Sequence, residues 1–148
     1  MAASSNKPRV RMHVGMRFTS EARVSARSAM AFAKRAGDFN PLHHDIRYAR
    51  HSRFGGLILS GTQTSSLLMG LLATKAVPFA LSLGLAFRLR FLAAARPGDH
   101  LSLEWRVTSV KAKRSLHGDI VKLAGTLRDS SGRKLIAAHA TILASARH

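Results

Sequence analysis

The sequence predicts an α+β fold in which an antiparallel sheet wraps around a central apolar helix. Residues 61–75 carry no charged side chain before Lys75, and a helix that is apolar on nearly all sides is typical of a buried position. Beyond Pro78, apolar and polar residues alternate with the period that strands with one buried face show. Because the chain has 148 residues and no internal repeat or linker, we expect one domain over residues 9–148, preceded by a flexible tail at residues 1–8.

The region before the central helix is predicted to contain a strand and a longer helix. Residues 10–18 are expected to form the strand, with an interruption near Gly15. Apolar residues then recur at helical spacing over residues 26–36, and Ser25 is placed to cap the start of this helix. Gly37 follows directly, as a glycine that ends a helix should.

Four strands are predicted after the central helix. Residues 83–91 and residues 101–108 alternate in the same way on either side of a turn at residues 96–99. Residues 120–128 and 135–144 give the last two strands. In the simplest arrangement, these four strands form an antiparallel meander whose apolar face packs on the helix. The N-terminal strand then joins the same sheet. Such a sheet keeps an open edge, which a homodimer or a dimer-based oligomer would cover.

The loop at residues 37–45 is the chemically informative stretch, because it holds Asp38, Asn40 and His43 around Pro41. Proline fixes its own φ and restricts the residue before it, so the stretch is a shaped turn and not a helix interior. A carboxylate and an imidazole on one stiff loop can flank one reacting site, as general acid–base catalysis requires. The structural alternative is that Asp38 and Asn40 only form the turn and that His43 lies on the surface.

Other features of the sequence have structural interpretations or exclude a chemistry. Asp45 is placed to cap a short helix over residues 46–50, and this is favoured over a role as a third catalytic carboxylate. His44 is expected to face outward, and the remaining histidines show no spacing typical of metal ligands. The chain has no cysteine, which excludes disulfides, thiolate chemistry and cysteine–zinc sites. We therefore expect no metal and no bound cofactor.

The formal net charge of +17 favours anionic partners such as nucleic acid, phosphorylated cofactors, acidic proteins or a membrane face. The Lys and Arg residues are scattered, however, and no basic helix, zinc-finger spacing or aromatic RNA-binding motif accompanies them. General solubility is therefore favoured over nucleic-acid binding. No apolar run is long enough to span a bilayer, and the start lacks the apolar stretch of a signal peptide, so a cytoplasmic location is the default expectation.

Several short motifs follow one another in a characteristic order. They are Phe32-Ala33, the loop at residues 37–45, Tyr48-Ala49, Arg53-Phe54-Gly55, Ser60-Gly61, residues 87–92 and Arg96-Pro97-Gly98-Asp99. Over residues 10–145, this order resembles the MaoC-like dehydratases, which are the (R)-specific enoyl-CoA hydratases of the hot-dog superfamily. The resemblance implies a hot-dog fold and a hydro-lyase that interconverts trans-2-enoyl thioesters and (R)-3-hydroxyacyl thioesters. Coenzyme A or an acyl carrier protein would carry the substrate.

The resemblance also implies roles for individual residues. Asp38 and His43 match the catalytic aspartate and histidine of the family, and Asn40 matches an asparagine that helps to orient the loop and the substrate site. Gly61 matches a glycine whose N–H binds the thioester carbonyl, and the free N–H groups at a helix start suit a developing enolate. Ser60 replaces the histidine that usually precedes this glycine. Its hydroxyl can still cap the helix, and the smaller side chain puts the substrate preference in question.

Two further functions stay open at this point. The hot-dog fold also hosts thioesterases, because a fold does not fix a function. A non-catalytic protein that binds acyl thioesters or nucleic acid is the second alternative, and the high charge motivates it.

If the substrate carries phosphate groups, two groups of basic residues are candidates to contact them. These groups are Arg47, Arg50 and Arg53 after the loop, and Arg88 and Arg90 on the first strand of the meander.

Overall fold

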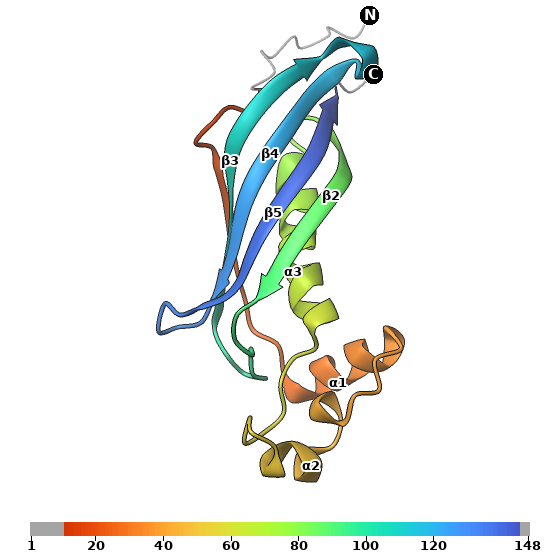
Figure 1. Ribbon diagram of the computed structural model, residues 1–148, viewed down its shortest axis with the longest axis vertical. Coiled ribbons are helices and arrows are strands. Elements are labelled where there is room, and N and C mark those ends of the chain that lie inside the picture. Colours follow the sequence, from red (N-terminus) through yellow and green to blue (C-terminus); the bar gives the residue numbers. More distant parts are fainter. Residues whose placement is uncertain (1–10, 146–148) are drawn as a thin grey trace, which may run out of the picture.

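The computed structural model describes residues 11–145 of the chain, so the predicted tail at residues 1–8 lies outside the described residues. One five-stranded antiparallel sheet lies against the long helix α3, and α1 and α2 are grouped beyond one end of the sheet (Figure 1). The elements are β1 (Arg17–Ala22), α1 (Ala26–Arg35), η1 (Pro41–His43), α2 (Ile46–His51), α3 (Gly61–Ala76), β2 (Leu81–Phe91), β3 (Leu101–Lys113), η2 (Arg114–Leu116), β4 (Gly118–Arg128) and β5 (Lys134–Ser145).

The strand order in the sheet is β1-β3-β4-β5-β2, with every neighbouring pair antiparallel. The α+β sheet on a helix is confirmed, but the predicted meander is wrong at its first step. Strand β2 pairs with β5 and not with β3, because β1 occupies the edge of β3 that β2 would need. Residues 92–100 therefore carry the chain from one edge of the sheet to β3, and β1 and β2 are the two edge strands.

The core lies between the sheet and one side of α3. Leu68, Leu72 and Ala76 of the helix are buried against strands whose inward residues are also buried. Trp105 of β3 is fully buried, and its indole Nε1–H donates a hydrogen bond of 2.8 Å to the carbonyl oxygen of Leu68. Gly125 lies under this ring, where a Cβ atom would come within 2.6 Å of Trp105 Cε3. The glycine thus lets the largest core side chain reach the helix.

The opposite side of α3 is exposed in the single chain, so the expectation that this helix is buried all round is only half right. Met69 is 39% exposed, and its neighbours on this side are exposed as well. They are Ser66, Gly70, Ala73 and Thr74. These small residues permit close approach of another surface. Across the described part of the chain, the helices are too short or too polar to span a membrane.

The first strand begins later than predicted. Residues 10–18 were expected to be extended, but the strand runs from Arg17 to Ala22. Gly15 adopts φ of 89° in a turn, and the Met16 N–H bonds back to the His13 carbonyl oxygen at 3.1 Å. Because only glycine adopts such a φ without strain, Gly15 marks the turn that leads into the strand and does not interrupt it. The Gly15 N–H then bonds to the Val107 carbonyl oxygen, which starts the pairing of β1 with β3.

The two predicted caps are confirmed. The Ser25 hydroxyl oxygen accepts a hydrogen bond of 3.1 Å from the Ser28 N–H at the start of α1. The Asp45 carboxylate accepts one of 2.9 Å from the Tyr48 N–H at the start of α2. These caps fix the ends of the loop between α1 and α2, and this loop carries Asp38, Asn40 and His43.

Candidate active site

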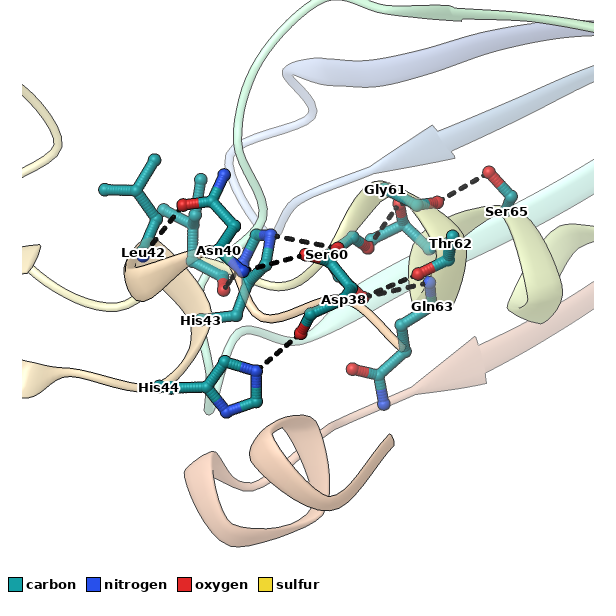
Figure 2. Close-up of polar contacts among 12 residues, drawn as sticks. Asp38, Asn40, Leu42, His43, His44, Ser60, Gly61, Thr62, Gln63 and Ser65 are labelled. Carbon is teal, nitrogen blue, oxygen red and sulfur yellow. Dashed lines mark hydrogen bonds and ion pairs between the residues drawn. The ribbon is translucent and has the colours of Figure 1, made fainter. Parts of the chain in front are cut away.

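The loop between α1 and α2 faces the N-terminal end of α3 (Figure 2). Two backbone interactions attach the loop to the segment that leads into α3. The Ile58 N–H donates a hydrogen bond of 3.2 Å to the Leu42 carbonyl oxygen. The ring Nδ1 of His43 lies 2.9 Å from the Ile58 carbonyl oxygen. The loop and the helix start therefore form one unit, although they are separated in the sequence by α2.

His43 is only 7% exposed, so the structural alternative in which it is a surface histidine is wrong. Because a carbonyl oxygen can only accept, the contact with Ile58 requires the proton to be on Nδ1 when the ring is neutral. The other nitrogen, Nε2, then has a free lone pair. It lies 3.4 Å from Oδ2 of Asp38, which is beyond an ordinary hydrogen bond. Both atoms are consequently available to a third group.

Asp38 is held by the backbone around it. Its own N–H bonds to the carbonyl oxygen of Ala33 at 2.9 Å, which continues the last turn of α1. Its Oδ1 accepts a hydrogen bond of 3.1 Å from the Asn40 N–H, and its carbonyl oxygen lies 2.6 Å from Nε2 of His44. His44 therefore braces the loop and does not simply face outward. With Oδ1 engaged, Oδ2 is the oxygen that Asp38 presents to His43.

Asn40 has a structural position in this loop. Its Oδ1 accepts a hydrogen bond of 3.1 Å from the Leu42 N–H and thereby caps the short helix η1. The side chain is not among those that line the adjoining cavity. Asn40 thus shapes the turn that places Asp38 and His43, and it is Pro41 and Asn40 together that set the direction of the chain here.

The N-terminal end of α3 presents free N–H groups toward the loop. Ser60 is the N-cap residue, is 1% exposed, and its hydroxyl oxygen accepts hydrogen bonds from the Gln63 N–H at 3.3 Å and from the Thr62 hydroxyl at 3.0 Å. The N–H groups of Gln63 and Thr64 both bond to the Ser60 carbonyl oxygen. Gly61 is the first residue of the helix, and its N–H has no acceptor within the described part of the chain. Ser60 thus serves as the cap, while Gly61 carries the free donor.

A cavity of about 350 Å³ opens between His43 and Gly61, a volume within the range of small-molecule sites. Its wall is mostly apolar and includes Leu59, Phe91, Leu92, Leu135 and Ile136. Of the five candidate arginines, Arg53 lines this cavity, whereas Arg47, Arg50, Arg88 and Arg90 do not. A larger cavity of about 690 Å³ lies at the far end of α3, and none of the predicted site residues lines it.

The structure therefore brings together Asp38, His43 and Gly61, and it gives Asn40 and Ser60 capping positions beside them. Sequence reasoning missed two contributors. The Ile58 carbonyl oxygen has no side-chain signature that could have revealed it. Phe91 was read as an ordinary inward residue of a strand, but it is 58% exposed and its ring covers Gly61. Among the described residues, no cluster of three or more histidine, aspartate or glutamate side chains could hold a metal ion.

Comparisons with known proteins agree with this arrangement. Residues 10–126 match the family defined by the MaoC like domain. Over 105 residues, which are 71% of this chain and 78% of the relative, the sequence is 31% identical to the (R)-specific enoyl-CoA hydratase of Aeromonas caviae. The structure of the (R)-hydratase from A. caviae involved in PHA biosynthesis superposes with a TM-score of 0.81 at 27% identity, over 92% of this chain and 98% of that one. The MaoC-like dehydratase of Rhodospirillum rubrum superposes with a TM-score of 0.76 at 32% identity, over 93% and 95% of the two chains.

These neighbours are hot-dog proteins of the hydratase and dehydratase type, and their likeness extends over the loop, the start of α3 and most of the sheet. The chain therefore belongs to the family of proteins with a MaoC-like dehydratase domain.

Proposed function

We propose that this protein reversibly hydrates trans-2-enoyl thioesters to (R)-3-hydroxyacyl thioesters. The observation that carries the proposal is the pair of free acceptors, Nε2 of His43 and Oδ2 of Asp38, which lie 3.4 Å apart, together with the cavity that both His43 and Gly61 line. Asp38 does not itself line the cavity and reaches it through His43. This arrangement combines an acid–base pair with a donor for a carbonyl oxygen.

The geometry suits a water molecule shared by the two acceptors. As the water adds its oxygen to C3 of the enoyl group, His43 or Asp38 takes up one of its protons, and a proton is delivered to C2. The double bond between C2 and C3 is lost, and one molecule of water is consumed in total. The reverse sequence removes the C2 proton and the C3 hydroxyl and releases water. The contact of Nδ1 with Ile58 keeps the His43 ring in the orientation that both directions require.

The start of α3 would stabilise the charge that develops during the reaction. In the enolate, which has no proton added at C2, negative charge lies on the carbonyl oxygen of the thioester. The Gly61 N–H can donate a hydrogen bond to this oxygen, and the positive end of the helix dipole stabilises its charge. Loss of one such donor typically raises a barrier by about 3 kcal/mol. The apolar wall formed by Phe91, Leu92 and Leu135 offers a surface for the acyl chain, and Arg53, which lines the same cavity, is the candidate contact for a phosphate-bearing carrier.

The test is to measure the loss of the conjugated enoyl absorbance with wild-type protein and with Asp38→Asn and His43→Ala. Asparagine keeps an acceptor for the Asn40 N–H, so the loop should remain in place. We expect each variant to lower the hydration rate by at least about a hundredfold. Circular dichroism should show that both remain folded.

His51→Ala is a matched control, since His51 is an exposed histidine on the neighbouring helix α2 and does not line the cavity. Its rate should stay within about twofold of wild type. Near-normal turnover by either dyad variant would refute the acid–base assignment. Release of free thiol without enoyl loss would instead identify a thioesterase.

A further inference from the structure

The face of the sheet that is turned away from α3 carries an excess of positive charge. We call this surface the outer sheet face. Its Lys and Arg residues are Arg17, Arg88, Arg90, Arg106, Lys111, Lys113, Lys122, Arg128 and Lys134. The carboxylates on it are Glu21, which lies 2.8 Å from Nε2 of His100, and Glu104, which is paired with Arg17. Nine Lys and Arg residues that look scattered along the sequence thus share one surface with two carboxylates.

The strand register shows how the charges are arranged. Residues directly opposite each other on neighbouring strands lie on the same face of the sheet. One row across the outer sheet face consists of Arg88, His139, Ala124, Arg106 and Arg17. The next row consists of Arg90, Ala137, Thr126, Glu104 and Thr19. In the first row the arginines stand at both sides, on β2 and on β3 and β1, with Ala124 and His139 between them. In the second row Arg90 on β2 is the one basic residue, and Glu104 stands on β3.

This alternation of long and short side chains leaves two shallow grooves. One of about 570 Å³ runs over β1, β3 and β4 past Arg106, Thr126 and Arg128. The other, of about 490 Å³, runs over β2, β5 and β4 past Arg88 and Lys122. Three strand spacings separate β2 from β3, which corresponds to about 14 Å. In the first row, Arg88 and Arg106 therefore stand this far apart across Ala124 and His139, and Lys122, Arg128 and Lys134 add positive charge on β4 and β5.

We propose that the outer sheet face binds the backbone of double-helical nucleic acid without reading its sequence. Arginine and lysine together with hydroxyl groups, here Thr19, Ser102 and Thr126, are the donors that contact backbone phosphates. The separation of Arg88 and Arg106 across the first row is comparable to the width of the major groove, about 12 Å, so phosphates on both of its edges can be contacted together.

Single strands fit this surface less well. Binding of single strands relies on aromatic side chains on which bases stack. The aromatic residues of the strands lie on the other face: Phe18, Phe87 and Trp105 pack into the core, and Phe91 covers Gly61. An anionic membrane also fits less well, because the exposed apolar side chains of Leu81 and Leu83 lie at one end of β2 and not among the arginine rows.

The test compares two variants of equal net charge. The face variant is R106Q/K111Q/K122Q/K134Q, and the control is R23Q/R27Q/K34Q/K75Q, whose positions lie on α1, on α3 or in the loop before α1. Among the described residues, none of these eight side chains makes a hydrogen bond or ion pair, so folding should be preserved in both. The measurement is fluorescence anisotropy of a labelled duplex of about 30 base pairs, in two unrelated sequences, over a range of salt concentrations.

The logarithm of the binding constant should fall with the logarithm of the salt concentration by about 0.9 for each phosphate contacted. The face variant should therefore have a slope that is shallower by about 3 to 4, while the control keeps nearly the wild-type slope. The two duplex sequences should bind equally well. All three proteins should have the same kcat for hydration, because none of the altered residues lines the cavity beside His43.

Three results would overturn the proposal. Equal weakening of binding by both variants would show that net charge alone attracts the duplex. No binding of either duplex would exclude the partner. Binding of vesicles that contain phosphatidylserine, without binding of duplex, would assign the surface to a membrane. None of these results bears on the hydration reaction, so failure here and failure of the proposed function can be told apart.

Discussion

Replacement of Gly61 by alanine tests why α3 begins with a glycine. A Cβ atom at this position would lie 3.2 Å from Cε1 and 3.3 Å from Cζ of the Phe91 ring. Favourable contacts between carbon atoms lie at about 3.5–4.0 Å, so the ring has to move by a few tenths of an ångström. Since Phe91 is 58% exposed, it has room to do so, and the fold should survive.

Two effects of opposite sign determine the stability of this variant. Alanine in place of glycine stabilises a compatible conformation by about 0.4–1 kcal/mol, through the unfolded chain. Overpacking typically costs about 1–3 kcal/mol, and a ring at the surface favours the lower end. The net loss of folding free energy should be at most about 1 kcal/mol, equivalent to a few degrees in Tm.

The loss of activity should be larger than the loss of stability, because the methyl group and the displaced ring both narrow the approach to the Gly61 N–H. A loss of about 2 kcal/mol in the transition state corresponds to a reduction of about 30-fold in kcat/KM.

The assay is the enoyl-loss rate of wild type, Gly61→Ala, Phe91→Ala and the double variant, each with a melting curve. Without the ring, the added Cβ atom has space. The double variant should therefore have a kcat/KM at least about tenfold higher than the product of the two single effects predicts. Simple additivity would refute the argument that the ring contact explains the glycine. Unchanged activity of Gly61→Ala would refute the argument that this end of the helix meets the substrate.

The remaining predictions follow from the helix start, the sheet edge and the charge. Gly61→Pro, which removes the N–H, should abolish turnover far more than it weakens binding of the thioester, as a comparison of single-turnover rates with ligand affinity would show. Sedimentation at micromolar concentration should give a homodimer, because β2 is an open edge and one side of α3 is exposed; a stable monomer would contradict this. Raising salt toward physiological strength should raise KM and leave kcat nearly constant, since screening at about 8 Å weakens steering of an anionic carrier. The hydrogen bond from the Ser131 hydroxyl lowers the pKa of Asp129. The ionised carboxylate therefore stabilises the β4–β5 turn at neutral pH, and this contribution is lost as pH falls through the pKa of Asp129. Ser131→Ala should move the Asp129 titration, followed by NMR, to higher pH.

Local signals in the sequence predicted most of the elements. Ser25 and Asp45 are N-caps whose role depends only on a few neighbouring residues, and both were placed correctly. The same holds for the turn around Pro41, whose stiffness is a property of the residue itself. Asp38 and His43 could therefore be placed near each other because the loop that joins them is short and constrained.

Features that depend on distant contacts could not be predicted in this way. The pairing of β2 with β5 follows from competition between strands for the edge of β3, which no single strand encodes. The position of Phe91 over Gly61 requires the end of a strand and the start of a helix to meet. The gathering of cations on the outer sheet face likewise becomes visible only with the register of all five strands.

The chemistry and the shape of the site come from different segments of the chain. The proposed acid–base pair lies on the loop between α1 and α2, which is attached to the helix start through Leu42, His43 and Ile58. The wall of the cavity comes mainly from residues 91–95 and from Leu135 and Ile136 on β5. Under the proposed function, substitutions in the wall should therefore change which acyl chains are accepted without disturbing proton transfer. This division makes the protein a suitable starting point for engineering chain-length preference, since a library confined to the wall leaves the reactive pair and its supports intact.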